Sequence, residues 1–307
     1  MEVCVSSHAR IHLGFYTYPP DPNPWRGAGI YLSKPSLTVC AGDYTGLSVP
    51  DCFEEEQVVK LARISKGDTG IRVYGCIPPH RGLGSSTQLY LSAAMAISLY
   101  TIGSFDWEST VYKLKRHVTS RVGALLFKYG GIIVDGSSVT GKPVLKPSYT
   151  GKLPGDWRVI IVDPGGPSGP RESWEEEKWR SLPPAPAGLV HTAYDAVGKM
   201  ERAVEEGDLD GFTSAARVLD SVTGEYFSHA TKTSSTRCSE ALDYLAGNGV
   251  YLMQSSWGPT MYTFAGKDSA RYVASIIREA FELEGCSIRF LDVVAPWNEG
   301  ARASWTR

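Results

Sequence analysis

A glycine-rich segment just before a long apolar stretch carries the residue types best suited to hold an anion. It reads PPHRGLGSSTQL over residues 78–89. Glycines let a ligand approach the main chain closely, and the first turn of a following helix offers unpaired N–H groups and the positive end of the helix dipole. We expect the anion to be phosphate and five residues to hold it: Gly82, Gly84, Ser85, Ser86 and Thr87.

The same segment also admits a purely structural interpretation, a glycine turn that ends in a Ser/Thr helix cap. It has neither the Gly-Lys-Ser/Thr of a Walker A loop nor the glycine spacing of a Rossmann fingerprint. The pattern therefore predicts an anion site without saying whether the phosphates are those of ATP.

The overall composition is that of a globular protein with little net charge. The 307 residues include 31 Lys and Arg against 33 Asp and Glu, a net charge of -2. Without a basic field, nucleic acid is not expected as a partner. No apolar run approaches the roughly 20 residues that span a bilayer, so no membrane association is expected. No signal-peptide pattern is visible at the start, and we expect a cytoplasmic location.

The six cysteines are scattered along the chain and include no CxxC pair. This pattern favours buried thiols in a reducing compartment, with disulfides as the alternative that an even number leaves open. No group of His and Cys has the spacing of a zinc site.

Hydrophobic periodicity predicts an α+β chain whose composition shifts at residues 142–156. We place a domain boundary there, between residues 1–155 and 156–307. For the first part we expect strands and helices in this order: strands at 2–16 and 29–42, a helix at 54–66, a strand at 69–78, helices at 87–99 and 107–117, and a short helix followed by a strand within 122–136.

The second part is expected to form a ferredoxin-like domain. A strand at 158–163 opens it, and helices follow at 189–206, 208–222 and near 238–245. Two strands flank residues 255–260, and a last helix precedes Gly285 and the closing strand. Strand, helices, two strands, helix and strand is the split β-α-β order of that domain.

Three segments together resemble the motifs of the GHMP kinase superfamily, which includes galacto-, homoserine and mevalonate kinases. PPHRGLGSST resembles the superfamily's phosphate loop, ARIHLGFYTY (9–18) its N-terminal motif, and SSWGPTMYTF (255–264) its C-terminal glycine motif. Their order and spacing match over almost the whole chain. The resemblance implies a two-domain GHMP-kinase-like fold, with the glycine loop in an N-terminal α+β domain.

A narrower resemblance rests on four runs: RIHLGF near the start, HRGLGSSTQL (80–89), FKYGGIIVDG (127–136) and QSSWGPTMY (254–262). These runs are similar to those of β-ribofuranosylaminobenzene 5′-phosphate synthase, an archaeal enzyme family of methanopterin biosynthesis. The resemblance implies condensation of phosphoribosyl pyrophosphate with 4-hydroxybenzoate or 4-aminobenzoate, with release of pyrophosphate and CO2. It also implies Mg²⁺ as cofactor, and we expect a homodimer.

One residue separates this chain from the kinases. Their catalytic aspartate precedes a Gly-Gly pair, and in this chain that place falls on Gly123. Glycine cannot take a proton from a hydroxyl group, so the loop is expected to hold phosphates other than those of ATP. An ATP-dependent small-molecule kinase with a base from elsewhere, and a non-catalytic ligand-binding relative, remain as alternatives.

Outside the loop, candidate residues follow from the resemblance and from their positions. His12, His80 and Asp135 are the candidate catalytic residues, and Asp135 also suits a contact to Mg²⁺ or ribose. The added positive charges of Arg121 and Lys128, where the synthases differ, either strengthen phosphate binding or mark a different substrate. Substrate binding is assigned to a larger set: Arg10, Arg26, Gln88, Arg171, Ser255, Ser256, Trp257 and Gly258.

Overall fold

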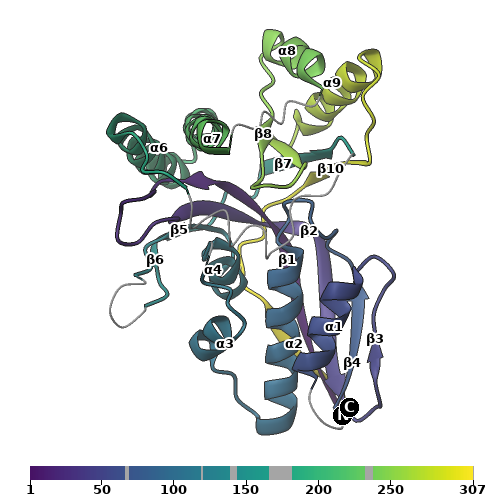
Figure 1. The fold of residues 1–307 in the computed structure, drawn as a ribbon. Helices are drawn as coiled ribbons and strands as arrows, with labels where there is room; N and C mark the ends of the chain where they lie inside the picture. The colour runs from purple at the N-terminus through teal and green to yellow at the C-terminus, as the bar shows by residue number, and fades with distance from the viewer. Residues whose placement is uncertain (66–68, 119, 139–143, 166–181, 232–237, 307) are drawn as a thin grey trace.

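The computed structural model describes residues 1–65, 69–118, 120–138, 144–165, 182–231 and 238–306. These residues form an α+β structure with two β-sheets, each flanked by helices (Figure 1). The predicted fold class is therefore confirmed.

The first sheet is built around two long strands, β1 (Glu2–Phe15) and β2 (Gly27–Gly42), which run antiparallel to each other. Both strands contribute many buried apolar side chains, and these form one side of the largest hydrophobic core. The remaining strands of this sheet are β3 (Leu47–Ser48), β4 (Gly70–Gly75), β5 (Ile132–Asp135), β6 (Pro147–Gly151) and β11 (Arg302–Thr306).

Helix α2 (Ser85–Ile102) lies against β1 and β2 and is the central helix of this half (Figure 1). Its buried residues include Leu89, Leu91 and Ala93, which explains why the segment is apolar on nearly every side. Three shorter helices surround it: α1 (Glu55–Ile64), α3 (Trp107–Lys113) and α4 (Val122–Tyr129).

The second sheet is antiparallel and has the strand order β10-β7-β9-β8. By position along the chain this is the order fourth, first, third, second, as expected for a split β-α-β domain. Its strands are β7 (Trp157–Asp163), β8 (Met253–Gln254), β9 (Met261–Gly266) and β10 (Phe290–Val294), and its helices are α6 (Ala187–Glu206), α7 (Leu209–Thr231), α8 (Ser239–Gly247) and α9 (Ala270–Leu283).

The chain does not finish in the second sheet, which departs from the predicted division at residues 155 and 156. After β10 it returns to the first sheet, where β11 pairs with β1 from Glu2 opposite Thr306 to Ser6 opposite Arg302. The two termini therefore lie side by side (Figure 1). The last strand was missed because it is short and its side chains are mostly exposed, so it has no apolar pattern to detect.

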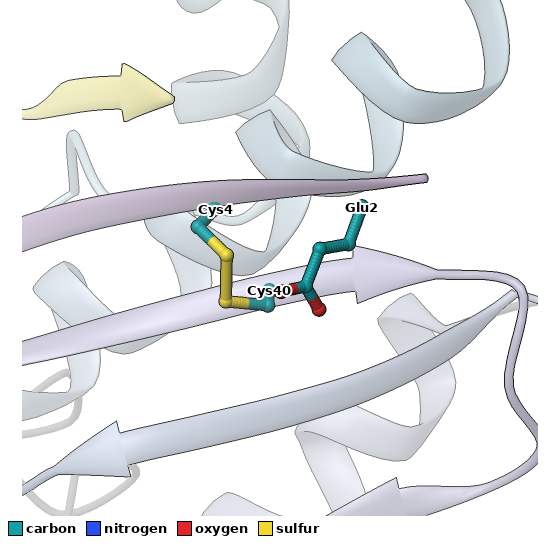
Figure 2. Close-up of side chains that lie close together, drawn as sticks. All are labelled: Glu2, Cys4 and Cys40. Carbon is teal, nitrogen blue, oxygen red and sulfur yellow. A yellow bond between two sulfur atoms is a disulfide. The ribbon is translucent and has the colours of Figure 1, made fainter. Parts of the chain in front are cut away.

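The expectation of free thiols is wrong, because all six cysteines are paired: Cys4–Cys40, Cys52–Cys76 and Cys238–Cys286. Figure 2 shows the first pair, which joins directly opposite positions of β1 and β2 beside Glu2. Glu2, Cys4 and Cys40 are the one group with metal-ligand proximity among the described residues. The disulfide removes both thiolates, so this group offers a metal only one carboxylate.

No helix in the described ranges combines the length and apolar character needed to cross a membrane. The cytoplasmic location itself stays a prediction.

Candidate functional site

The two glycine motifs meet in space although they lie far apart in the sequence. A Cβ atom on Gly82 would lie 2.2 Å from the carbonyl oxygen of Ser255, and one on Gly258 would lie 2.0 Å from the amide nitrogen of Gly82. Real Cβ atoms do not approach this closely, so only glycine lets these two backbones touch. The loop and the C-terminal turn therefore form one unit.

Polar contacts fix the orientation of the loop. The Gly82 carbonyl accepts hydrogen bonds from the Arg10 guanidinium at 2.6 Å and from the Ser255 hydroxyl at 2.7 Å. The Leu83 carbonyl accepts one from the backbone N–H of Arg10 at 3.0 Å. Two loop carbonyl oxygens are thus directed toward β1 and the C-terminal turn. These partial negative charges therefore do not point at the start of α2, where a negatively charged ligand would bind.

The start of α2 has no capping side chain. The N-cap residue is Gly84, in the left-handed conformation with φ 78°, and it provides no side-chain cap hydrogen bond. A Ser/Thr cap, the structural alternative for this segment, is therefore absent. Since the first N–H groups of a helix need partners, this end is suited to an anion.

A glutamine that sequence reasoning missed orients the hydroxyls of this turn. Gln57 of α1 is buried, and its side-chain amide donates to the Ser86 hydroxyl at 3.0 Å and to the Ser85 hydroxyl at 3.5 Å. An acceptor role in these bonds leaves each hydroxyl's own hydrogen for another group. The only sequence signal at Gln57 is its position three residues after Glu54, which suits a capping box at the start of α1. That signal does not predict a contact with α2.

Arg81 ties the loop to the second sheet. Its guanidinium forms two hydrogen bonds with the carboxylate of Asp163, the last residue of β7, and the Nε–Oδ2 distance is 2.6 Å. The Arg81 side chain is 2% exposed and that of Asp163 is 0% exposed. The sequence gives no hint of this pair, whose partners are 82 residues apart.

His80 lies at the entrance of the loop with a positive φ of 53°. Its Nε2 atom is 3.4 Å from a carboxylate oxygen of Glu54. This contact holds the ring toward the start of α1. A catalytic role for His80 stays a prediction.

A cavity of about 160 Å³ lies next to the paired turns. It is lined by residues of β1, α7, β8 and the turn that follows β8. Its walls include the rings of Phe15, Phe227 and Trp257, and the Phe227 and Trp257 rings meet edge to face at 4.7 Å. A cavity with aromatic walls suits a flat, apolar ligand.

His12 lines this cavity and is almost fully buried. Its Nδ1 atom accepts the N–H of Gly14 at 3.2 Å, which assigns the ring proton to Nε2, 3.1 Å from the Ser120 hydroxyl. Burial, and then the charge of Arg10, hold the pKa of His12 well below its usual range. The arrangement favours a neutral N–H donor over an acid or base.

Asp220 of α7 also lines the cavity and was not among the sequence candidates. One of its carboxyl oxygens accepts the backbone N–H of Gln254 at 3.0 Å. Burial raises the pKa of Asp220 from 3.8 to about 7, and the Gln254 hydrogen bond opposes this only in part. The sequence could not reveal it, because an acidic residue on a helix is usually a solvated one.

This raised pKa has a consequence for stability. Between pH 3.8 and about 7 the folded protein keeps a proton on Asp220 that the unfolded chain releases, so this residue's contribution to the free energy of unfolding falls as pH rises through that window and is constant above it. We expect Asp220→Asn to become more stable relative to the wild type from pH 4 to pH 8, as measured by urea unfolding. A difference that does not vary with pH would contradict the raised pKa.

Asp135 has partners inside the protein. Its carboxylate receives the Nε–H of Arg121 at 2.7 Å and the N–H of Ser137 at 2.8 Å, and it is fully buried. The pairing also neutralises Arg121, so this arginine is not an added charge for phosphate. A carboxylate used in this way does not fit a preformed Mg²⁺ site, and the described residues outside the Glu2 group contain no other cluster of ligands.

Gln88 faces inward and not toward the loop's ligand side. Its amide oxygen accepts the hydroxyl hydrogen of Tyr31 at 2.6 Å, and its amide nitrogen donates to the carbonyl of Gly123 at 3.0 Å. Both polar ends are used and the side chain is fully buried, which does not favour a contact with substrate; the assignment of Gln88 to substrate binding stays a prediction. Gln88 holds Gly123 beside α2.

Gly123 lies where its missing side chain would face the loop helix. A Cβ atom there would be 3.4 to 3.7 Å from the side chain of Thr87, an ordinary contact. The position predicted to hold the kinase aspartate is therefore next to the first turn of α2, and a Cβ atom there would make only ordinary contacts.

The remaining candidates are distributed around this centre. Ser256 and Trp257 line the cavity, while the Ser255 hydroxyl is used between His12 and Gly82. Arg26 lies over the Tyr16 ring, with its guanidinium 3.4 Å from Asp21, and it does not line the cavity. Arg171 lies outside the described residues.

Lys128, the other residue with an added positive charge, is directed to a different part of the fold. Its ammonium group lies over the Trp107 ring of α3 at 4.3 Å and over that of Tyr129 at 5.1 Å. It therefore has aromatic partners of its own, and a role in phosphate binding is not supported.

Comparison with solved structures identifies the fold. Homoserine kinase from Cytophaga hutchinsonii superposes with a TM-score of 0.66 at 14% identity, covering 99% of this chain and 97% of the other. Mevalonate diphosphate decarboxylase from Staphylococcus aureus superposes with a TM-score of 0.69 at 11% identity, covering 99% and 98%. The chain has the fold of the GHMP kinase superfamily, as its three motifs predicted.

Comparison with curated proteins is more specific. The chain is 26% identical over 305 residues to β-ribofuranosylphenol 5′-phosphate synthase of Methanocaldococcus jannaschii. The alignment covers 86% of this chain and 89% of the synthase. The synthase of the same name from Methanothermobacter thermautotrophicus is 28% identical over 247 residues, covering 69% and 73%. No protein-family profile matches the chain. The predicted resemblance to these archaeal synthases, and the prediction of an enzyme, are confirmed.

Proposed function

We propose that this protein condenses phosphoribosyl pyrophosphate with a para-substituted benzoate, 4-hydroxybenzoate or 4-aminobenzoate, and releases pyrophosphate and CO2 in the biosynthesis of a methanopterin-type cofactor. One observation carries the proposal: an aromatic-walled cavity is lined by the same C-terminal turn that contacts the glycine loop, and this loop leads into an uncapped helix start that suits phosphate. A phosphorylated sugar and a flat aromatic ring are the two reactants such neighbouring sites accept.

Each part of the site meets a demand of this reaction. Pyrophosphate leaves as an anion, and the N–H groups at the start of α2 would stabilise its growing charge. The sugar carbon becomes cationic as that bond breaks, and the rings of Phe15, Phe227 and Trp257 would keep water away from it. The same rings would hold the benzoate flat against the sugar.

The lack of a basic side chain in the described cavity wall favours the second half of the reaction. Among the described residues that line it there is no Lys or Arg. A carboxylate bound without a cation has less to lose when its charge spreads into the ring as CO2 departs. The alternative, a cation beside the carboxylate, is the role predicted for Arg171, which lies outside the described residues.

Mg²⁺ is proposed as the companion of the pyrophosphate group, since Asp135 is committed to Arg121. Magnesium in phosphate-transferring sites is commonly held by the substrate's own phosphates with few protein ligands. A homodimer is the assembly we propose.

A kinase is the second candidate function, and Gly123 argues against it. The test compares two incubations of the purified protein: phosphoribosyl pyrophosphate with each benzoate, and labelled ATP with sugars, mevalonate and homoserine. We expect pyrophosphate release in the first and no phosphoryl transfer in the second. Turnover of ATP to a phosphorylated acceptor, without pyrophosphate release in the first incubation, would refute the proposal.

Ser85→Ala tests the phosphate site separately from the aromatic one. The change removes one hydroxyl donor, which costs roughly 1–3 kcal/mol if its bond to phosphate is charge-assisted. We expect the Kd for phosphoribosyl pyrophosphate to rise about 5- to 150-fold, while the Kd for the benzoate is unchanged, both by calorimetry. Equal weakening of the two ligands would mean that Ser85 supports the fold instead.

A further inference from the structure

The cavity contains one charged group whose function is not explained by the fold. Asp220 is the single Asp, Glu, Lys or Arg among the described residues that line the cavity. Its one hydrogen bond in the described structure is from the N–H of Gln254, to Oδ1, and no arginine or lysine of the described ranges forms an ion pair with it. Burying an ionised carboxyl group among aromatic side chains costs free energy. A contact with a polar group of the ligand would offset this cost.

We propose that Asp220 is a catalytic residue that accepts the proton of the substrate's para-hydroxyl group while the ring attacks the sugar, and returns it afterwards. The proposal rests on the proposed function and extends it to a named group. It also assigns the ring's polar end to α7.

The chemistry balances with this single proton carrier. As the hydroxyl proton moves to Asp220, its electron pair enters the ring and the carbon bearing the carboxylate bonds to C1 of the ribose. The C1–oxygen bond breaks and pyrophosphate leaves with its electrons. The carbon–carboxylate bond then breaks, CO2 departs, and the electron pair restores the aromatic ring. The para oxygen takes its proton back from Asp220.

The groups that face Asp220 leave it as the base. From β1, His12 is neutral and its Nδ1 lone pair is engaged with Gly14. From β9, the hydroxyl of Tyr262 is close enough for the charge of Asp220 to raise its pKa, which burial raises further. From β8, Gln254 contributes its backbone N–H. A carboxyl whose pKa is about 7 both accepts and returns a proton near neutrality.

The proposal makes a distinction between the two benzoates. The nitrogen of 4-aminobenzoate donates its lone pair without first losing a proton, so it does not need a base at the moment of attack. A hydroxyl group donates strongly only as its proton leaves. Asp220 should therefore matter for 4-hydroxybenzoate far more than for 4-aminobenzoate.

The test compares Asp220→Asn with the wild type and with Glu225→Gln, an exposed change of the same kind on the same helix. Turnover is measured with saturating phosphoribosyl pyrophosphate and each benzoate from pH 5 to pH 9. For 4-hydroxybenzoate we expect the Asn variant to lose about 10²- to 10⁴-fold in kcat, and the wild-type rate to rise through about pH 7. Glu225→Gln should match the wild type.

Four results have distinct meanings. If the wild type is active but Asp220→Asn keeps its rate on 4-hydroxybenzoate, or loses the same factor on both benzoates, the proposal is overturned. If only 4-hydroxybenzoate is a substrate, the pH profile decides: a wild-type rate that is flat through pH 7 also overturns the proposal. If only 4-aminobenzoate is a substrate, the proposal is overturned as well, because no hydroxyl proton is transferred. If the wild type releases no pyrophosphate with either benzoate, the proposed function has failed instead. The pH profile of the wild type does not depend on whether the variant folds.

Discussion

Gly82→Ala is expected to weaken binding of phosphoribosyl pyrophosphate by about 100-fold or more. The added methyl group would meet the Ser255 carbonyl oxygen at 2.2 Å, so the loop and the C-terminal turn must separate. A misplacement of about 1 Å in groups that position a substrate costs on the order of 100-fold in rate, and we expect a loss of similar size in affinity because the same loop holds the phosphate. Calorimetric titration of the folded variant with phosphoribosyl pyrophosphate measures the effect.

Gly103→Ala is the matched control for this change. Gly103 has nearly the same backbone angle, φ 71° against 82° for Gly82, but a Cβ atom there meets nothing within 4 Å. Both alanines carry the left-handed backbone strain, about 1–2 kcal/mol, and only the first breaks the contact between the turns. Equal affinity of both variants for phosphoribosyl pyrophosphate would show that the loop is a structural turn.

Asp163→Asn is expected to lower the free energy of unfolding by about 3–5 kcal/mol. The change leaves the Arg81 guanidinium buried without its countercharge, and removing one partner of a buried pair has this cost. Because Arg81 belongs to the glycine loop, the same variant should also bind phosphoribosyl pyrophosphate less tightly. Urea unfolding gives the first quantity and calorimetry the second.

Glu299→Gln provides the comparison with an exposed ion pair. Glu299 pairs with Arg302 in side chains that are 49% and 64% exposed, and such pairs contribute at most about 1 kcal/mol. Stability losses of similar size for Asp163→Asn and Glu299→Gln would mean that the buried pair does not join the loop to the second sheet.

The parts predictable from the sequence are those with a local pattern. The strand after residue 1, the helix after the glycine loop and the order of elements in the second half all have periodic apolar residues, and the structure has them. The loop and the C-terminal turn were recognisable from their glycines. Gly285, expected just beyond the last helix, follows α9 with a positive φ of 64°.

An error in the predicted end of one helix excluded several residues that line the cavity. The sequence predicts a helix that ends at 222, before Thr223-Gly224, yet α7 continues to Thr231. Tertiary contacts explain the continuation: the Thr223 hydroxyl accepts the N–H of Phe15 at 3.0 Å. The extended part of this helix supplies Gly224, Phe227 and Ser228 to the cavity.

Other features depend on contacts between distant segments and have no local signal. Asp220, the Arg81–Asp163 pair and the role of Gln57 each require knowing which elements meet. The three disulfides were missed for the same reason, since scattered spacing does not show which cysteines are neighbours. The sequence suggested that Asp135 was available to bind a metal or ribose. It did not show that Arg121, the residue just before α4, pairs with Asp135 inside the protein.

The most direct test of the proposed reaction follows the carboxyl carbon of the benzoate. The protein is incubated with Mg²⁺, phosphoribosyl pyrophosphate and 4-hydroxybenzoate or 4-aminobenzoate labelled in the carboxyl group, and labelled CO2 and pyrophosphate are counted together. We predict one CO2 for each pyrophosphate, with no CO2 when phosphoribosyl pyrophosphate is omitted. Pyrophosphate release without CO2, or no release of either from both benzoates, would contradict the proposed condensation.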